Sequence, residues 1–127
     1  MTIDATVVLD IGKTNAKLTL LDAAGAILAE ERRPNSIVHA GPYPHHDTER
    51  LWDWLQTGLA AFARLAHVTA IVPVTHGATA ALVDDDGLVL PILDYESTLP
   101  QSLAAEYASL RPAFADRLSP QLPCGLN

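Results

Sequence analysis

The chain has 127 residues, of which 49% are hydrophobic and 18% are charged, and this composition excludes collagen-like, low-complexity and intrinsically disordered proteins. Its length fits one domain of modest size. Eight Lys and Arg against fifteen Asp and Glu give a net charge of −7, so the surface as a whole repels nucleic acids and anionic membranes. We therefore expect neither as a partner, and any anion site must be local.

The chain shows no sequence signs of secretion. Its single cysteine, Cys124, cannot form an internal disulfide or a Cys-rich zinc site, and it fits a reducing compartment. Residues 1–4 lack the basic segment that precedes the apolar run of a signal peptide. No apolar stretch approaches the roughly 18 residues of a membrane span. The sequence predicts a soluble, cytoplasmic protein.

Three apolar runs in the first part of the chain, each bounded by turn residues, predict strands over residues 5–12, 16–22 and 26–32. Helix is the alternative for residues 18–31, because Leu and Ala are good helix formers. Gly25 would lie inside that helix at a cost of about 1 kcal/mol relative to alanine. We therefore expect a three-stranded meander.

Residues 35–46 are rich in Pro, Gly and His, and this predicts an exposed loop. Asp47 or Thr48 can cap a helix that then runs to about Ala66. Trp54 falls at the border of the apolar face of that helix. The face itself has residues spaced three and four apart, as in an amphipathic helix: Trp52, Leu55, Leu59, Phe62 and Ala66.

Residues 68–74 predict another buried strand. Because a helix leads into it, we expect this strand to lie parallel to an earlier one. The element order therefore predicts an α/β protein with a mixed sheet.

Two shorter apolar runs, residues 80–83 and 88–93, flank Asp85-Asp86-Gly87, and this turn predicts a hairpin. A second helix is expected over residues 101–110, capped near residues 97–98. The Pro-rich tail predicts irregular structure.

The turn between the first two expected strands, residues 10–17, contains both lysines of the chain. A glycine lets backbone amides approach an anion closely, and the neighbouring side chains add hydrogen-bond donors and positive charge: Gly12, Lys13, Thr14, Asn15 and Lys17. Asp10, at the end of the strand, can hold Mg²⁺ beside phosphates. A solvated hairpin with lysines on its rim is the alternative. A Walker A loop is excluded because Val7 stands where that pattern needs glycine.

Segment 10–17 resembles the first phosphate loop of the FGGY carbohydrate kinases, members of the sugar kinase, Hsp70 and actin superfamily. Residues 75–87 and 90–95 resemble the substrate loop and hairpin of that family, and residues 122–127 resemble the section before the next helix. The likeness covers nearly the whole chain. It implies an incomplete RNase H-like (actin-like ATPase) mixed sheet with an antiparallel β-meander and flanking helices.

The resemblance implies that residues 1–127 are the amino-terminal portion of the first kinase domain, with the second, adenosine-binding domain absent. It implies ATP and Mg²⁺ as cofactors, with Asp10 as the Mg²⁺-associated carboxylate. It assigns the phosphates to Asp10, Gly12, Lys13, Thr14, Asn15 and Lys17. It assigns the sugar to His76, Gly77, Asp94, Tyr95 and Glu96.

The implied reaction is ATP-dependent phosphorylation of a ketose or polyol, such as a pentulose or hexulose. The family's general base lies far downstream, so we expect no catalytic base in this chain and no activity of the chain alone. Lys13, Asn15 and residues 94–96 depart from the family's usual residues, which leaves the sugar open. Two alternatives are a nucleotide- or phosphate-binding regulatory module of the same superfamily and a ligand-free interaction domain.

Three histidines also have ordinary structural interpretations. Without the resemblance, His76 after a buried strand is more typical of a packed, hydrogen-bonded side chain; with it, contact with a sugar is favoured. His45 and His46 on a Pro-rich loop are more typical of solvated residues than of metal ligands. The sequence leaves the oligomeric state open, a homodimer included.

Overall fold

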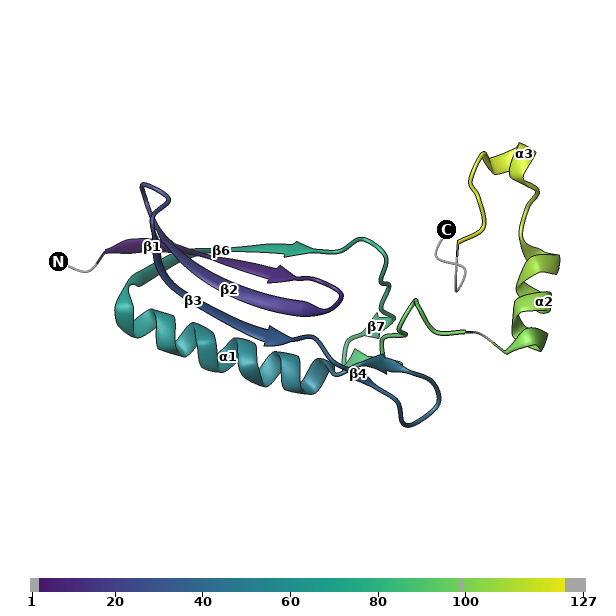
Figure 1. Ribbon diagram of the computed structural model, residues 1–127, viewed down its shortest axis with the longest axis horizontal. Helices are drawn as coiled ribbons and strands as arrows, with labels where there is room; N and C mark the ends of the chain where they lie inside the picture. The colour runs from purple at the N-terminus through teal and green to yellow at the C-terminus, as the bar shows by residue number, and fades with distance from the viewer. Residues whose placement is uncertain (1–2, 99, 123–127) are drawn as a thin grey trace. The chain divides into compact units, whose positions relative to one another are not determined.

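A computed structural model describes residues 3–98 and 100–122 (Figure 1). Cys124 and most of the resembling segment 122–127 lie outside the described residues. The chain forms two compact units. The first extends to Val38 and includes His46–Gly77, and the second contains His39–His45 and the described residues from Ala78 onward.

The first unit contains a four-stranded sheet with the order β3-β2-β1-β6. Its strands are β1 (Asp4–Ile11), β2 (Asn15–Asp22), β3 (Ile27–Pro34) and β6 (His67–Thr75). β2 runs antiparallel to β1 and β3, whereas β6 is parallel to β1. The expected meander and mixed sheet are therefore confirmed, and the helix considered for residues 18–31 is excluded. The expectation that the strand over residues 68–74 is buried is wrong, because β6 is exposed along nearly its whole length. Gly25 makes the turn before β3 with a positive φ of 83°.

Helix α1 (Thr48–Leu65) lies along one face of this sheet (Figure 1). Alternate residues of β1 and β2 point toward the helix, as the period of two in a strand requires. These side chains and two positions at the end of the helix segment form the core: Ala5, Val7, Leu9, Leu18, Leu20, Phe62 and Ala66. Each fully buried large apolar side chain contributes about 1.5–3 kcal/mol. Because these side chains lie between the sheet and α1, the opposite face of the sheet is the one that the helix leaves uncovered.

The cap of α1 is as expected, but the orientation of its two tryptophans is not. The carboxylate of Asp47 accepts a hydrogen bond from the backbone N–H of Arg50 at 3.2 Å. Trp52 was predicted in the core face but is 58% exposed, whereas Trp54 packs against the core. The two lie about 80° on either side of Phe62 around the helix, so periodicity cannot choose between them. In the structure, the side of α1 that carries Trp54 is the one that packs against the core.

The expectation of a wholly exposed loop at residues 35–46 is wrong. Asn35 and His46 are only 7% and 6% exposed, and two short strands, β4 (Ile37–Val38) and β5 (His45–His46), lie within the segment. The composition correctly indicated the absence of long elements. It gave no sign that two polar residues of the segment, Asn35 and His46, are buried.

The second unit contains the expected hairpin and helix. Strands β7 (Val83–Asp84) and β8 (Gly87–Leu88) pair around the predicted turn, but they are shorter than the apolar runs suggested. Helix α2 (Gln101–Leu110) has the predicted bounds. Its N-cap is Pro100 with no capping side chain, so the cap expected at residues 97–98 is wrong.

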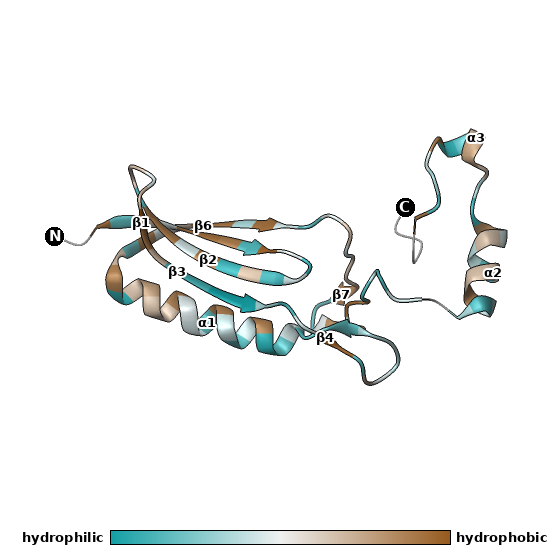
Figure 2. Ribbon diagram, viewed as in Figure 1, coloured by the Kyte–Doolittle hydropathy of each residue, from teal (hydrophilic) through white to brown (hydrophobic). Residues whose placement is uncertain are grey.

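The tail, expected to be irregular, contains the short helix α3 (Phe114–Arg117). Figure 2 shows a contrast within the sheet of the first unit, because β3 is mainly hydrophilic and β6 is mainly hydrophobic. Neither α1 nor any other helix among residues 3–98 and 100–122 has the length and apolar character needed to cross a membrane.

Candidate functional site

The turn between β1 and β2 is tight and displays polar groups. The backbone N–H of Gly12 donates to the carbonyl of Asn15 at 2.8 Å. A Cβ added at Gly12 would lie 3.1 Å from that same carbonyl oxygen, so glycine is favoured by close packing within the turn. The backbone N–H of Gly12 is thus already hydrogen-bonded within the turn. Thr14 and Asn15 are exposed, and the Asn15 side-chain amide donates to the Thr14 hydroxyl at 3.1 Å.

Asn35 anchors this turn, and no feature of the sequence had marked it as important. Its side-chain amide donates to the carbonyl of Gly12 at 2.8 Å, and its backbone N–H donates to the carbonyl of Thr14 at 2.9 Å. The residue directly follows β3, and its burial in a segment predicted to be exposed reflects these two bonds. The geometry of the turn therefore depends on a residue about twenty positions away in the sequence.

His76 lies beside the turn because β1 and β6 are parallel, so their carboxyl ends meet at one edge of the sheet. Its backbone N–H donates to the carbonyl of Ile11, the residue before Gly12, at 3.3 Å. The half-buried ring of His76 faces the ring of His46, with 6.0 Å between their centroids. A Cβ added at Gly77 would meet nothing within 4 Å, so this side of the loop is open.

The face of the sheet that points away from α1 carries a charged hollow of about 250 Å³. Asp10 and Lys17 are cross-strand partners, and both line it. Its floor is mainly apolar, and the full set of lining residues is Val8, Asp10, Lys17, Thr19, Leu21 and Val74. A carboxylate and an ammonium group therefore share a partly apolar surface next to the turn.

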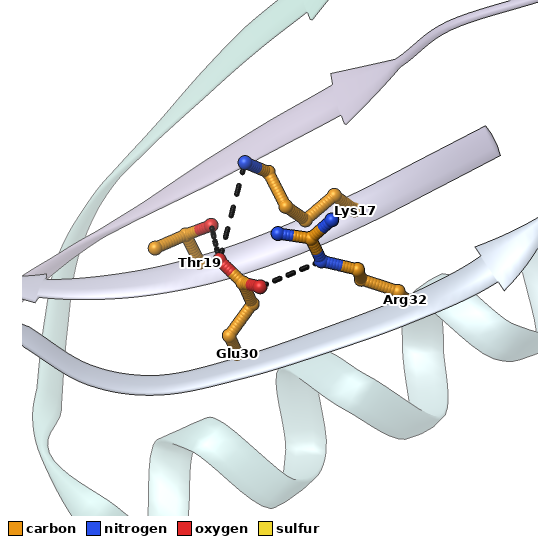
Figure 3. Close-up of polar contacts among 4 residues, drawn as sticks. All are labelled: Lys17, Thr19, Glu30 and Arg32. Atoms are coloured by element: carbon orange, nitrogen blue, oxygen red, sulfur yellow. Dashed lines mark hydrogen bonds and ion pairs between the residues drawn. The ribbon is translucent and has the colours of Figure 1, made fainter.

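The carboxylate of Glu30 in β3 contacts three polar side chains at the border of this hollow (Figure 3). Arg32 Nε donates to Glu30 Oε1 at 2.7 Å, and Lys17 Nζ lies 3.9 Å from Glu30 Oε2. The Thr19 hydroxyl donates to the same Oε2 over 3.5 Å. The hydrogen bond from Arg32 lowers the pKa of Glu30 below its ordinary value, and the charges of Arg32 and Lys17 lower it further.

The remaining predicted sugar residues lie in the second unit. Asp94 is 7% exposed, and its carboxylate accepts from the backbone N–H of Glu96 at 3.2 Å. Its own N–H donates to the carbonyl of Pro44 at 2.9 Å. Asp94, half-buried Tyr95 and exposed Glu96 form a turn after the isolated bridge at Leu93, in place of the end of a strand.

The first unit thus brings together the predicted phosphate residues and His76. The side chains of the turn suit a polyphosphate, because exposed Thr14 and Asn15 lie in the same segment as the two lysines, whereas the Gly12 amide expected to approach the anion is bound within the turn. Asp10 supplies one carboxylate, which suits Mg²⁺ because that ion often binds through one or two carboxylates plus substrate phosphates. The described part of the chain has no group of three or more His, Cys, Asp or Glu side chains arranged to hold a metal ion by themselves.

No family model and no curated protein sequence matches the chain. Among solved structures, a carbohydrate kinase from Novosphingobium aromaticivorans matches with a TM-score of 0.85 and 41% identity, over 100% of this chain and 27% of that chain. The resemblance to the FGGY carbohydrate kinases is confirmed. So is the mixed sheet of the RNase H-like, actin-like ATPase fold.

Two more distant structures show the same fold. A xylulose kinase from Rhodospirillum rubrum matches with a TM-score of 0.69 and 21% identity, over 87% of this chain and 24% of that chain. A gluconate kinase from Lactobacillus acidophilus matches with a TM-score of 0.65 and 16% identity, over 86% of this chain and 23% of that chain. This chain therefore spans about a quarter of the length of these carbohydrate kinases.

Proposed function

We propose that the chain is the amino-terminal portion of the first domain of an ATP-dependent kinase that phosphorylates a ketose or polyol, such as a pentulose or hexulose. The observation that carries this proposal is the hydrogen bond from His76 to Ile11. It puts the candidate sugar residue beside the candidate phosphate turn at one edge of the sheet. The 41% identity to a carbohydrate kinase over the whole chain supports the same assignment.

Phosphoryl transfer requires positioning of the reactants, neutralisation of charge on the phosphoryl group and a base for the acceptor hydroxyl. Lys13, Lys17 and the donors of the turn supply positive charge and hydrogen bonds for the phosphates. Asp10 supplies one ligand for Mg²⁺, and bound Mg²⁺-ATP supplies the phosphoryl group. His76 and Asp94 offer the polar groups that a sugar hydroxyl requires.

The chain supplies no acceptor base in this proposal, and three carboxylates of the candidate site and its border have other roles. Asp10 is assigned to the cation, Glu30 pairs with Arg32, and Asp94 accepts a backbone hydrogen bond within its turn. A second domain would bring the adenosine site, and other parts of the kinase would bring the base. We therefore propose that the isolated chain is inactive, that the complete enzyme acts in the cytoplasm, and that its partner is a small-molecule sugar.

The proposal is tested by titrating the ¹⁵N-labelled chain, first with sodium triphosphate and Mg²⁺ and then with D-xylulose or glycerol. We expect triphosphate to shift the amide signals of Lys13 and Thr14, and the sugar to shift those of His76 and Asp94. Asp10→Asn should abolish the effect of Mg²⁺ on triphosphate binding. Asp85→Asn, on the exposed hairpin turn, is the matched control and should leave it unchanged.

The other outcomes identify the alternatives. Shifts at Lys13 and Thr14 alone favour a phosphate-binding regulatory module, and the absence of shifts with either ligand favours an interaction domain. A coupled assay for ADP formation tests the expected inactivity. Sugar-dependent ATP turnover by the purified chain would contradict that part of the proposal.

A further inference from the structure

The register of the sheet places Glu30 on the same face as Lys17. Lys17 of β2 pairs with Arg32 of β3, and Thr19 pairs with Glu30, so all four side chains lie on one face. The neighbouring Leu18 belongs to the core on the opposite face, against α1. The carboxylate thus belongs to the open face that carries the charged hollow. Figure 3 shows Lys17 and Glu30 directed toward one another above the strands.

Lys17 therefore has two acidic neighbours with different geometry. Asp10 is its cross-strand partner in β1, and Glu30 is its ion-pair partner from β3. Lys17 is 34% exposed and Glu30 is 28% exposed, so the pair is accessible to water and to a ligand. Arg32 holds the carboxylate by a shorter contact of 2.7 Å, so Glu30 is fixed independently of Lys17.

We propose that Glu30 is a positioning residue for the polyphosphate site. It holds the ammonium group of Lys17 over the open face of the sheet, and a polyphosphate must compete with Glu30 for that ammonium group. Glu30 thereby sets how strongly the site binds phosphate. This inference rests on the proposed function, because it assumes that the ligand of Lys17 is a polyphosphate.

The binding test uses sodium triphosphate, titrated calorimetrically into the chain at low ionic strength. Glu30→Gln removes the competing charge and should tighten binding about two- to fivefold, the range expected of a partly exposed ion pair. Glu31→Gln is the matched control, because it makes the same charge change one residue away on the face that carries α1. Its affinity should stay close to that of the wild-type chain.

A double-mutant cycle separates an effect through Lys17 from simple charge repulsion. If Glu30 acts by holding the lysine, the gain from Glu30→Gln disappears in a Lys17→Met background. A gain of equal size in that background would overturn the proposal, because the carboxylate would then act on the phosphate directly.

Chemical labelling tests the ion pair without any ligand. The chain has two lysines, so brief acetylation followed by mass spectrometry gives the ratio of Lys17 to Lys13 modification. Glu30→Gln should raise this ratio at least twofold, because the Lys17 side chain is then no longer held in its ion pair with Glu30, whereas Glu31→Gln should not. An unchanged ratio overturns the inference. Absence of triphosphate binding by every variant instead contradicts the proposed function, and the labelling still decides the ion pair.

Discussion

The two units differ in how much of each is buried. All the buried apolar side chains among the described residues lie in the first unit, between the sheet and α1. In the second unit, Asp94 is the one buried residue among those described, and α2 buries none. Large apolar side chains there are exposed instead: Leu82, Val83, Leu88, Val89, Leu90, Leu103, Leu110, Phe114, Leu118 and Leu122.

This difference in burial indicates which unit is stabilised by packing among its own elements. The first unit buries a contiguous core, so its elements stabilise one another. In the second unit, the Asp-Asp-Gly turn and the local preferences of α2 specify the elements. A helix of ten residues is marginal by itself in water. We therefore expect the stability of the chain to reside in the first unit, and the following variants test that expectation.

The largest effect is expected from the two phenylalanines of the chain. Phe62 is 2% exposed between α1 and the sheet, whereas Phe114 of α3 is 58% exposed. Phe62→Ala should lower the free energy of unfolding by about 3–5 kcal/mol. Phe114→Ala should change it by less than about 0.5 kcal/mol. Urea denaturation followed by circular dichroism measures both. Similar losses from the two variants would show that the second unit also stabilises the fold through packing.

Hydrogen bonds between distant segments should show a smaller contrast. Asn35→Ala leaves the carbonyl of Gly12 without its side-chain donor, and we expect a loss of about 1–3 kcal/mol together with weaker triphosphate binding. In the second unit, Tyr43→Phe removes the 2.8 Å hydrogen bond from the Tyr43 hydroxyl to the carbonyl of Pro91. This should lower the free energy of unfolding by at most about 1.5 kcal/mol. Triphosphate binding should not respond to Tyr43→Phe. Equal effects on binding would contradict the anchoring role of Asn35.

The helix caps give a third comparison. Asp47→Ala removes the cap of α1 and should cost about 1 kcal/mol, measured by thermal or urea unfolding. The N-cap of helix α2 is Pro100, which provides no capping side chain, so Ser102→Ala in the first turn of α2 should change stability by less than about 0.5 kcal/mol. A large effect of Ser102→Ala would reveal a role in stability that the structure does not assign to α2.

The smallest effect concerns pH. Because the folded-state pKa of Glu30 lies below its ordinary value of 4.5, its contribution to stability is fully present above that value. The contribution is lost as the pH falls through the lowered pKa. The difference in unfolding free energy between the wild-type chain and Glu30→Gln should therefore be constant near neutral pH and shrink below about pH 4.5. Glu106→Gln, at an exposed position of α2, is the matched change in the second unit. A difference that persists in acid would contradict the assigned ion pair.

A short local pattern predicted the turn at residues 10–17, whereas the predicted role of His76 rests on the family resemblance alone. A glycine after a strand, with clustered lysines in an acidic chain, is visible without coordinates. Asn35 and Glu30 were missed for a different reason. Their importance comes from partners on other strands, Gly12 for one and Lys17 for the other, and no local pattern reports such pairing.

The four strands of the main sheet, helices α1 and α2 and the parallel placement of β6 follow from the sequence alone, because alternation, helical spacing and turn residues are local properties of the chain. The short strands β4 and β5 were not predicted. Packing in three dimensions is needed to explain why Trp54 packs against the core while Trp52 does not, why Asn35 is buried, and why Glu30 pairs with Lys17. These outcomes depend on the rotation of α1 against the sheet and on the cross-strand register. Both are set by packing between segments far apart in the sequence.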